Sequence, residues 1–377
     1  MRILQLAFAG ADQRGVHRKL AEQVTTLRRC GAVVESCVVV DSTVAALAPD
    51  APYALVDVAG GGFTEQSRAQ AFAHFRTRVR AFAPDVVYMR YPVYDAHVAA
   101  FVHDAPPVVF ELQTIYANEV PAAAASAEAH WASRVLPATS GLVAVTAEIL
   151  EHELERATWA IPGHVMPNGA DPRTIPFAAP ELSTSRIDVL CVASFYPWHG
   201  VDRLIVGLAA EPDVQDVHLQ LVGDGPMLPA LRELVVEAHL ESRVHFHGAM
   251  PVAALDEWYT SAHVAIGSLA PHRVGLRELA ALKHREYVLR GLPMVFAGGD
   301  ADFTPPLPWL RIVPADDSPV SPRLLRALAH AWSVDARRRQ IRAWGDAHVS
   351  WDAKIPGLLN FLATVVSTAD VTSRVGA

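Results

Sequence analysis

Cysteine is scarce in the chain, and long apolar runs are absent. Cys30, Cys37 and Cys191 are the three cysteines among 377 residues, and none lies in a CxxC or metal-ligand spacing. We interpret them as reduced structural thiols of a cytoplasmic protein. The apolar run at the amino terminus is too short for a signal peptide, and no later segment reaches the roughly 18 apolar residues of a membrane-spanning helix. These shortages argue against a secreted disulfide scaffold and against a transmembrane protein.

An excess of positive charge and the common nucleotide-binding motifs are also absent from the sequence. The 32 Lys and Arg residues against 40 Asp and Glu residues give a formal net charge of -8, which argues against a nucleic-acid-binding protein. No G-x-G-x-x-G follows the first predicted strand, and no G-x-x-x-x-G-K-[ST] occurs. Neither a dinucleotide dehydrogenase nor a P-loop NTPase is therefore supported. Gly60, Gly61 and Gly62 precede a predicted helix, and we interpret them as a flexible turn.

The sequence is instead rich in apolar residues, at 51% against 19% charged residues, as expected of well-packed folded domains. Its length exceeds what one hydrophobic core normally supports, so we expect two domains. Short apolar runs alternate with helical patterns, which is typical of βα units around a parallel sheet. Residues 167–186 are rich in Pro and in small or polar residues and interrupt this alternation as a linker would.

Both halves show the same alternation. The strands predicted before the linker are ILQLAFA, VVESCVVV, DVVYM, PVVFEL, LVAVT and the short HVM, and those after it are IDVLCVA, VHLQLVG, RVHFHG, HVAIGS, PMVFAG and WLRIVP. We therefore predict domains at 1–167 and 187–345, a linker at 168–186, and a helical tail at 346–377 whose apolar residues need a surface to pack against. Ligands of open α/β sheets bind beyond the carboxyl ends of the strands, so two such domains would face each other across a central cleft.

The stretch GLRELAALKHREYVLRGLPMVFAG carries two carboxylates and an ammonium. If residues 278 to 286 are helical, Glu278 and Glu286 lie about 12 Å apart, too far to act on one bond as an acid and base pair. They could hold the two ends of an elongated ligand such as a nucleoside diphosphate sugar, with Lys283 against the diphosphate. The alternative is a solvated helix face.

Several motifs together resemble those of the retaining glycosyltransferases of the GT-B fold, family 4. They are the E-x7-E spacing from Glu278 to Glu286, the segment LKHREYVLRGLPMV, VASFYPWHGVDRLI, LQLVGDGPMLPALREL and the junction VMPNGADP, in the order expected over essentially the whole chain. The resemblance implies two Rossmann-like doubly wound domains, the first on the acceptor side and the second for the nucleotide-sugar donor. It also implies a carboxyl-terminal helix that returns to the first domain, and neither a metal nor another cofactor.

The resemblance also implies roles for particular residues. Glu286 would bind the ribose hydroxyls, Glu278 the transferred sugar and Lys283 the diphosphate, while Gly15, in the loop after the first strand, would let the backbone approach the ligand. The predicted catalytic residues are Glu278, Lys283 and His199, and the predicted donor-binding residues are Glu286, Gly15, Ser194, Arg273, Arg277, Gly223 and Tyr287.

The chain departs from the family's R-x4-K pair, which falls on Ser194 and His199. One fixed cation is thus missing and the other is titratable. The diphosphate charge would then be met by Lys283 and His199, with Arg273 or Arg277, and donor binding should weaken as the pH rises through the pKa of His199. The alternative for His199 is a structural residue at the start of a helix.

On the acceptor side, Gln113 stands where the family often has a histidine. A glutamine side chain cannot take a proton, so the leaving diphosphate oxygen would accept the acceptor's proton. Glu111, Arg90 and Asn118 are the other acceptor-side candidates.

A stripe in AQAFAHFRTRVRAFAP favours peripheral membrane contact. Phe72, Phe75, Val79 and Phe82 share one side of the predicted helix while arginines project elsewhere, as in helices that lie on anionic membranes. The alternative is an ordinary domain helix with its apolar stripe on the sheet.

We therefore expect a cytoplasmic hexosyltransferase that acts in polysaccharide, glycolipid or glycoconjugate biosynthesis. Its acceptor would be a glycan, a lipid-linked or a small-molecule hydroxyl, and a lipid-linked acceptor would place it at the inner face of the membrane. The alternatives are a nucleotide-sugar epimerase, a phosphorylase, a sugar-binding protein or an inactive relative. The sequence leaves open the donor base, the sugar, the linkage and the oligomeric state.

Overall fold

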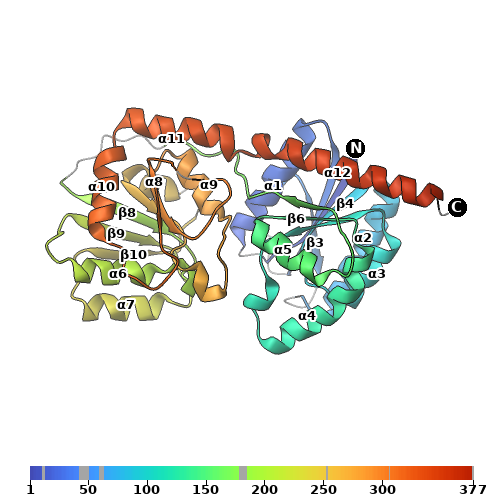
Figure 1. Ribbon diagram of the computed structural model, residues 1–377, viewed down its shortest axis with the longest axis horizontal. Helices are drawn as coiled ribbons and strands as arrows, with labels where there is room; N and C mark the ends of the chain where they lie inside the picture. The colour runs from blue at the N-terminus through green and yellow to red at the C-terminus, as the bar shows by residue number, and fades with distance from the viewer. Residues whose placement is uncertain are drawn as a thin grey trace. The chain divides into compact units, whose positions relative to one another are not determined.

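The computed structural model describes residues 1–10, 13–41, 51–58, 63–177, 185–251, 254–304 and 306–375, so the turn predicted at Gly60, Gly61 and Gly62 lies outside the described residues. Contacts divide the chain into two compact units (Figure 1). Unit 1 comprises Met1–Pro167 and Trp351–Ala377, and unit 2 comprises Asn168–Ser350.

Unit 1 is built on a seven-stranded parallel sheet with the order β3-β2-β1-β4-β5-β6-β7. The strands are β1 (Arg2–Phe8), β2 (Val33–Asp41), β3 (Ala54–Val58), β4 (Val86–Arg90), β5 (Val108–Leu112), β6 (Gly141–Ala144) and β7 (Gly163–Val165). β4 and β5 are nearly continuous buried runs, as strands covered on both faces must be. The strand order reverses between β1 and β4, which is where such sheets form ligand sites.

Three of the helices described in unit 1 begin at a capping side chain. The helices of the unit are α1 (Arg14–Arg29), α2 (Glu65–Phe82), α3 (Ala96–Asp104), α4 (Ala122–Val135), α5 (Ala147–Arg156) and α12 (Trp351–Val375), with short turns η1 (Tyr116–Asn118) and η2 (Leu136–Ala138). The side chains of Thr64, Asp95 and Thr146 accept hydrogen bonds from the first turns of α2, α3 and α5, which satisfies backbone N–H groups that a helix start leaves unpaired.

The apolar stripe of α2 is buried within unit 1. Phe72 and Phe75 are 0% exposed and Phe82 is 5% exposed, and the rings of Phe72 and Phe75 pack against Phe8 and Phe101. The predicted use of this stripe on a membrane is therefore wrong, because the core of the unit already covers it. Among the described parts of the chain, no helix is long and apolar enough to cross a bilayer.

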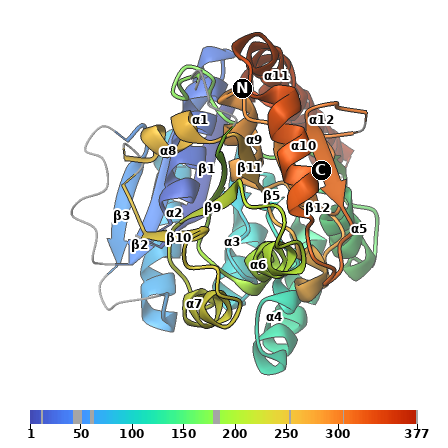
Figure 2. The same cartoon turned by 90° about the vertical axis from the view of Figure 1, so that its left-hand side faces the viewer.

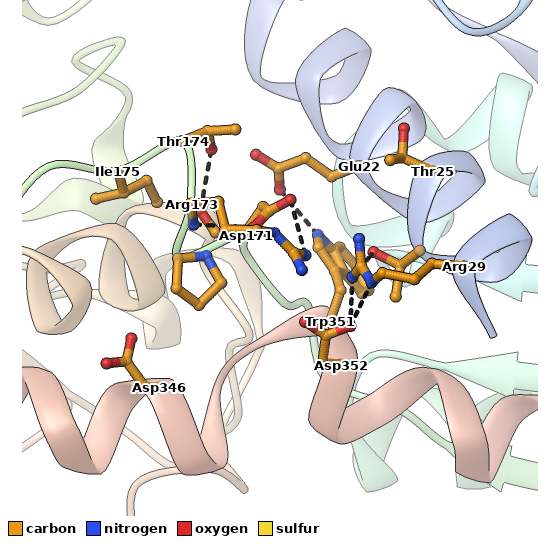
Figure 3. A network of polar contacts seen from close by, with 12 residues as sticks. Glu22, Thr25, Arg29, Asp171, Arg173, Thr174, Ile175, Asp346, Trp351 and Asp352 are labelled. Atoms are coloured by element: carbon orange, nitrogen blue, oxygen red, sulfur yellow. Dashed lines mark hydrogen bonds and ion pairs between the residues drawn. The ribbon is translucent and has the colours of Figure 1, made fainter.

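α12 belongs to unit 1 although it follows unit 2 in the sequence. Its residues Trp351, Ile355 and Leu358 are buried in one cluster with Val24 and Leu27 of α1. At its first turn, the indole Nε1 of Trp351 donates to Glu22 Oε2 at 2.9 Å, and Arg29 Nε donates to Asp352 Oδ1 at 3.0 Å (Figure 3). The buried contacts and these two hydrogen bonds hold the start of α12 against α1.

The tail differs from its predicted bounds of 346–377. α11 (Asp335–His348) ends within unit 2 and α12 begins at Trp351. The two helices are separate because Val349 is buried in the core of unit 2 and Ser350 forms a β-bridge with Ala170.

Unit 2 contains a six-stranded parallel sheet with the order β10-β9-β8-β11-β12-β13. The strands are β8 (Ile187–Val192), β9 (Val217–Val222), β10 (Val244–Gly248), β11 (Val264–Ile266), β12 (Met294–Ala297) and β13 (Leu310–Val313). One face is buried by α6 (Val201–Ala210), α7 (Leu228–Glu237) and α10 (Pro322–Trp332), and the other by α8 (Leu255–Ser261), α9 (Leu282–Leu289) and α11 (Figure 2). The predicted α/β class with two doubly wound parallel sheets is confirmed.

The predicted linker at 168–186 is partly wrong. Its described part packs onto unit 2, because Arg342 donates to the carbonyls of Pro172 and Ile175, both at distances of 2.7–2.8 Å. Asn168 also donates to the carbonyl of Ala280 at 2.6 Å. Residues 178–184 lie outside the described residues.

Candidate donor and acceptor sites

The first candidate site lies in unit 2, where β8 ends. The turn η3 (Pro197–His199) follows β8, and Gly200 ends it with φ +61° and starts α6. His199 is 8% exposed, and its Nδ1 lies 3.2 Å from the backbone N of Tyr196, which donates to it. The turn thus holds the imidazole against its own backbone.

The surroundings of His199 disfavour its charged form. Burial lowers the pKa of His199 well below its ordinary value, and the positive charge of Lys283 lowers it further, against a hydrogen bond with the Ser194 backbone that raises it. A neutral imidazole can still donate a hydrogen bond to a ligand or accept one from it. The lowered pKa argues against the predicted role of His199 as a titrating positive charge near neutral pH and favours the structural alternative at the WHG turn.

Lys283 is the most unusual charged residue of this site. It lies in the first turn of α9, and its buried Nζ has no hydrogen-bond partner among the residues that the structure describes. Burial lowers the pKa of the ammonium, and the neighbouring group that opposes this effect is the Cys191 thiol rather than a carboxylate. Because a buried ammonium without an acceptor is costly, the arrangement suits a site that receives an anion.

A buried ionic network fixes α9 in place. Arg285 donates from Nη1 and Nη2 to the two carboxylate oxygens of Asp300 at 2.5 and 2.6 Å, and from Nη2 to Asp302 at 2.6 Å. Nδ1 of His284 lies 3.0 Å from Asp300. Burial alone would raise the pKa of Asp300, but Arg285 and His284 lower it. Sequence reasoning missed this network, although the acidic pair in GGDAD directly after a strand was an available signal.

The two glutamates do not share a helix. α9 begins at Leu282, and Glu278 instead lies in an extended segment that bridges Gly299. The backbone N of Gly299 donates to Arg277 at 2.7 Å and Leu279 donates back to Gly299 at 2.8 Å, so the sheet-like pairing excludes the helix and its 12 Å spacing. Glu286 does lie on α9, is 6% exposed, and has Oε1 3.3 Å from Arg290 Nη2.

Three predicted donor-binding residues have structural roles in unit 2. Tyr287 is wholly buried and its hydroxyl accepts from Val192 N at 3.1 Å. Arg273 is bound by Asp202 and Asp317, so its charge is already neutralised. Gly223 has φ +136° and a Cβ there would lie 1.8 Å from the Ala193 carbonyl oxygen, so the end of β9 needs glycine for packing.

Three further residues were predicted to bind the donor. Ser194 and Arg277 are exposed at the surface of unit 2. Gly15 is the second residue of α1, so it lies at the start of this helix rather than in the predicted loop.

The second candidate site is a cavity of about 550 Å³ in unit 1. It lies where β1, β4 and β5 end, beside the reversal of strand order. Its lining includes Phe8, Phe63, Arg90, Tyr91, Gln113 and Tyr116. Two of the acceptor-side predictions, Arg90 and Gln113, thus reach one cavity. Asn118 is exposed and does not line it.

Glu111 lies behind this cavity in a buried polar network. Lys19 Nζ is 3.1 Å from Glu111 Oε1 and donates to Gln113 Oε1 at 2.7 Å, and Gln23 donates to Glu111 at 2.7 Å. Burial would raise the pKa of Glu111, but the charges of Lys19 and Arg90 outweigh it and the pKa is lowered. Sequence reasoning did not identify Lys19 and Gln23. The available signal was that these polar residues lie beside the apolar face of α1.

The comparisons with known proteins agree on the architecture. Residues 186–301 match the model of the family described as Glycosyl transferases group 1. No curated protein sequence matches the chain.

Solved structures match over almost the whole chain. Sucrose-phosphate synthase from Thermosynechococcus elongatus is 16% identical, with a TM-score of 0.71, and the match covers 98% of this chain and 100% of that one. A glycosyltransferase from Rickettsia africae is 13% identical, with a TM-score of 0.71 and coverage of 97% and 99%. HepE from Anabaena, solved with UDP-glucose, is 17% identical, with a TM-score of 0.65 and coverage of 98% and 100%. The chain has the GT-B fold, and the family match within unit 2 indicates a transferase enzyme.

Proposed function

We propose that this protein transfers a sugar from a nucleoside diphosphate sugar to a hydroxyl of an acceptor, with retention of the anomeric configuration. The observation that carries the proposal is the buried, unpartnered Nζ of Lys283, within the segment that matches the glycosyltransferase model. A diphosphate would supply the counter-charge and hydrogen-bond acceptors that this ammonium lacks. HepE, a structure of the same fold, binds UDP-glucose.

α9 would hold the donor at two points. Lys283 and Glu286 are three residues apart on the same helix, so their side chains are neighbours on its surface. In this proposal Lys283 binds the diphosphate and Glu286 accepts hydrogen bonds from the ribose hydroxyls. Glu278, on its extended segment, would contact the transferred sugar.

The transfer step needs no basic side chain. The bond between the anomeric carbon and the diphosphate oxygen breaks, and the acceptor oxygen bonds to that carbon on the same face of the ring. The acceptor's proton passes to the departing diphosphate oxygen, which agrees with a glutamine at position 113. Lys283 stabilises the charge that develops on the leaving group, and His199 contributes a hydrogen bond.

We propose that this charge stabilisation makes a metal ion unnecessary. The product would belong to a polysaccharide, a glycolipid or another glycoconjugate. The three cysteines are free thiols, which supports a reducing, cytoplasmic setting.

Donor binding can be tested with a panel of nucleotide sugars and thermal stabilisation of the purified protein. One donor should stabilise the wild type, and Lys283→Met should weaken its affinity by at least about 10-fold, the cost of losing hydrogen bonds to a charged group. Lys354→Met, in α12 of unit 1, is the matched control and should bind normally. An unchanged affinity in Lys283→Met would refute the proposal, and epimerised donor without acceptor would favour an epimerase.

A further inference from the structure

The cavity of unit 1 contains a guanidinium without an ion-pair partner. Arg90 ends β4 and lines the cavity. Across the described ranges it makes no ion pair and no side-chain hydrogen bond, unlike its neighbour Arg68, which is bound by Asp95. Burial lowers the pKa of Arg90, against the nearby carboxylate of Glu111 that raises it.

The strand register places Glu111 beside Arg90. The two residues are direct partners on β4 and β5, so their side chains project from the same face of the sheet. However, the carboxylate of Glu111 is already bound by Lys19 at 3.1 Å and by Gln23 at 2.7 Å. Lys19 and Gln23 thus occupy the carboxylate of Glu111, which acts on Arg90 through its charge and, within the described ranges, without a hydrogen bond.

The other titratable groups near Arg90 make no ion pair with it among the described residues, although the charge of Glu119 raises its pKa. Tyr88 is a neutral phenol whose pKa burial raises well above its ordinary value. Glu119 is exposed and accepts a hydrogen bond from the Thr114 hydroxyl at 2.6 Å. Asp95 caps α3 by accepting from Val98 N at 2.8 Å and pairs with Arg68. The N–H groups of the Arg90 guanidinium are therefore available to a ligand in the cavity.

The walls of the cavity suit a ring. Tyr91 and Tyr116 have ring centroids 6.2 Å apart, and Phe8 and Phe63 have centroids 5.3 Å apart. Gln113 Oε1 accepts from Lys19 at 2.7 Å and its Nε2 donates to the carbonyl of Glu111 at 3.4 Å, so the second N–H of the amide remains for a ligand. Aromatic faces and hydrogen-bond donors around about 550 Å³ fit a sugar-sized molecule, since small-ligand sites combine apolar walls with a few placed polar groups.

We propose that this cavity binds an acceptor whose sugar-sized ring carries an anionic group, a phosphate or a carboxylate, held by Arg90. The inference rests on the proposed function, because it takes the cavity of unit 1 as the acceptor site. A planar guanidinium binds either group through two parallel hydrogen bonds. Gln113 would then bind a hydroxyl or carbonyl of the same ring.

The test measures binding without any donor. Glucose, glucose 6-phosphate, glucuronate and inorganic phosphate are titrated into the full-length protein by calorimetry. We expect at least one of the two charged sugars to bind at least about 10-fold tighter than glucose and tighter than inorganic phosphate, and comparison of the two charged sugars identifies the anion. Arg90→Met should remove the preference, while Arg90→Lys should keep part of it.

Controls separate this inference from the proposed function. Arg80→Met, at the exposed end of α2, should keep the preference for charged sugars. Nucleotide-sugar stabilisation is read in the same samples, and Arg90→Met should leave it unchanged. Equal binding of glucose and its charged relatives, or a preference that survives Arg90→Met, would overturn the anion subsite. Loss of nucleotide binding alone would overturn only the transferase.

Discussion

At the scale of single residues, two kinds of buried charge contrast in this protein. Arg285 and Lys19 are each bound by carboxylates, and such pairs hold elements in place. Lys283 has a buried ammonium without a hydrogen-bond partner, and Arg90 makes no ion pair with a described residue. Perturbed charges of the second kind are typical of ligand sites, and both lie where parallel strands end.

Replacing Lys283 should separate stability from function. Lys283→Met removes a buried charge and keeps a side chain of similar length. The melting temperature should therefore rise by about 2–4 °C, which corresponds to a stabilisation of about 1 kcal/mol in a domain of this size. Nucleotide-sugar affinity should fall in the same variant. Differential scanning calorimetry with and without donor measures both, and a lower melting temperature would show that Lys283 is structural.

His199 should make the stability of the protein, rather than its donor affinity, depend on pH. Its pKa in the folded protein is lowered well below 6.5, so below about pH 6.5 the unfolded chain binds the proton first and the native state loses stability as pH falls. His199→Gln should therefore show a weaker loss of stability below that pH in urea titrations. The ratio of wild-type to variant donor affinity should stay constant between pH 6.5 and 8, and a ratio that changes with pH would restore the charged-histidine role.

At the scale of elements, α9 is positioned by tertiary contacts rather than by its own sequence. Ala281 caps it without a side-chain hydrogen bond, and Asp300 holds Arg285 and His284 from the segment after β12. Propensity and spacing therefore predicted a helix of the right kind but with the wrong start. The extended pairing of Glu278 with Gly299 is a long-range contact that a local pattern does not contain.

Asp300→Asn should destabilise unit 2. It leaves the buried guanidinium of Arg285 with a weakened partner, and breaking a buried pair costs about 3–5 kcal/mol. The urea midpoint of unit 2, measured through the loss of donor binding, should therefore be lower in this variant. Asp213→Asn breaks a surface pair with Arg323 and should cost about 1 kcal/mol or less. Similar midpoints for the two variants would contradict the role given to Asp300.

Most elements could be predicted from the sequence because fully buried parallel strands are short apolar runs. β3 was missed because its residues are mostly exposed and lack such a run, and α10 was missed between turn-rich segments. In the acceptor site, Arg90 and Gln113 could be found from their places after strands. Lys19 could not, because its burial depends on packing of α1 over Glu111.

At the scale of the whole molecule, each unit has its own core and its own candidate site. The chain leaves unit 1 at Pro167, forms unit 2 and returns as α12, which completes the core of unit 1 with wholly buried residues such as Trp351 and Ile355. The integrity of the acceptor cavity should thus depend on the last helix of the chain.

Trp351→Ala should weaken unit 1 selectively. Loss of a wholly buried Trp costs about 3–5 kcal/mol, so binding of a charged sugar in unit 1 should be lost at lower urea than binding of the nucleotide in unit 2. Asp352→Asn, which alters the partly exposed pair with Arg29, should have a small effect. Equal losses of both binding activities in Trp351→Ala would show that the two units unfold as one.

The most direct measurement of the central claim is the stoichiometry and stereochemistry of transfer. The donor that stabilises the protein is incubated with an anionic sugar acceptor, and released nucleoside diphosphate and glycoside product are quantified by NMR. We expect one diphosphate per glycoside, the anomeric configuration of the donor in the product, and a large loss of both in Lys283→Met. Absence of diphosphate release with every donor, or a product of inverted configuration, would contradict the proposed function.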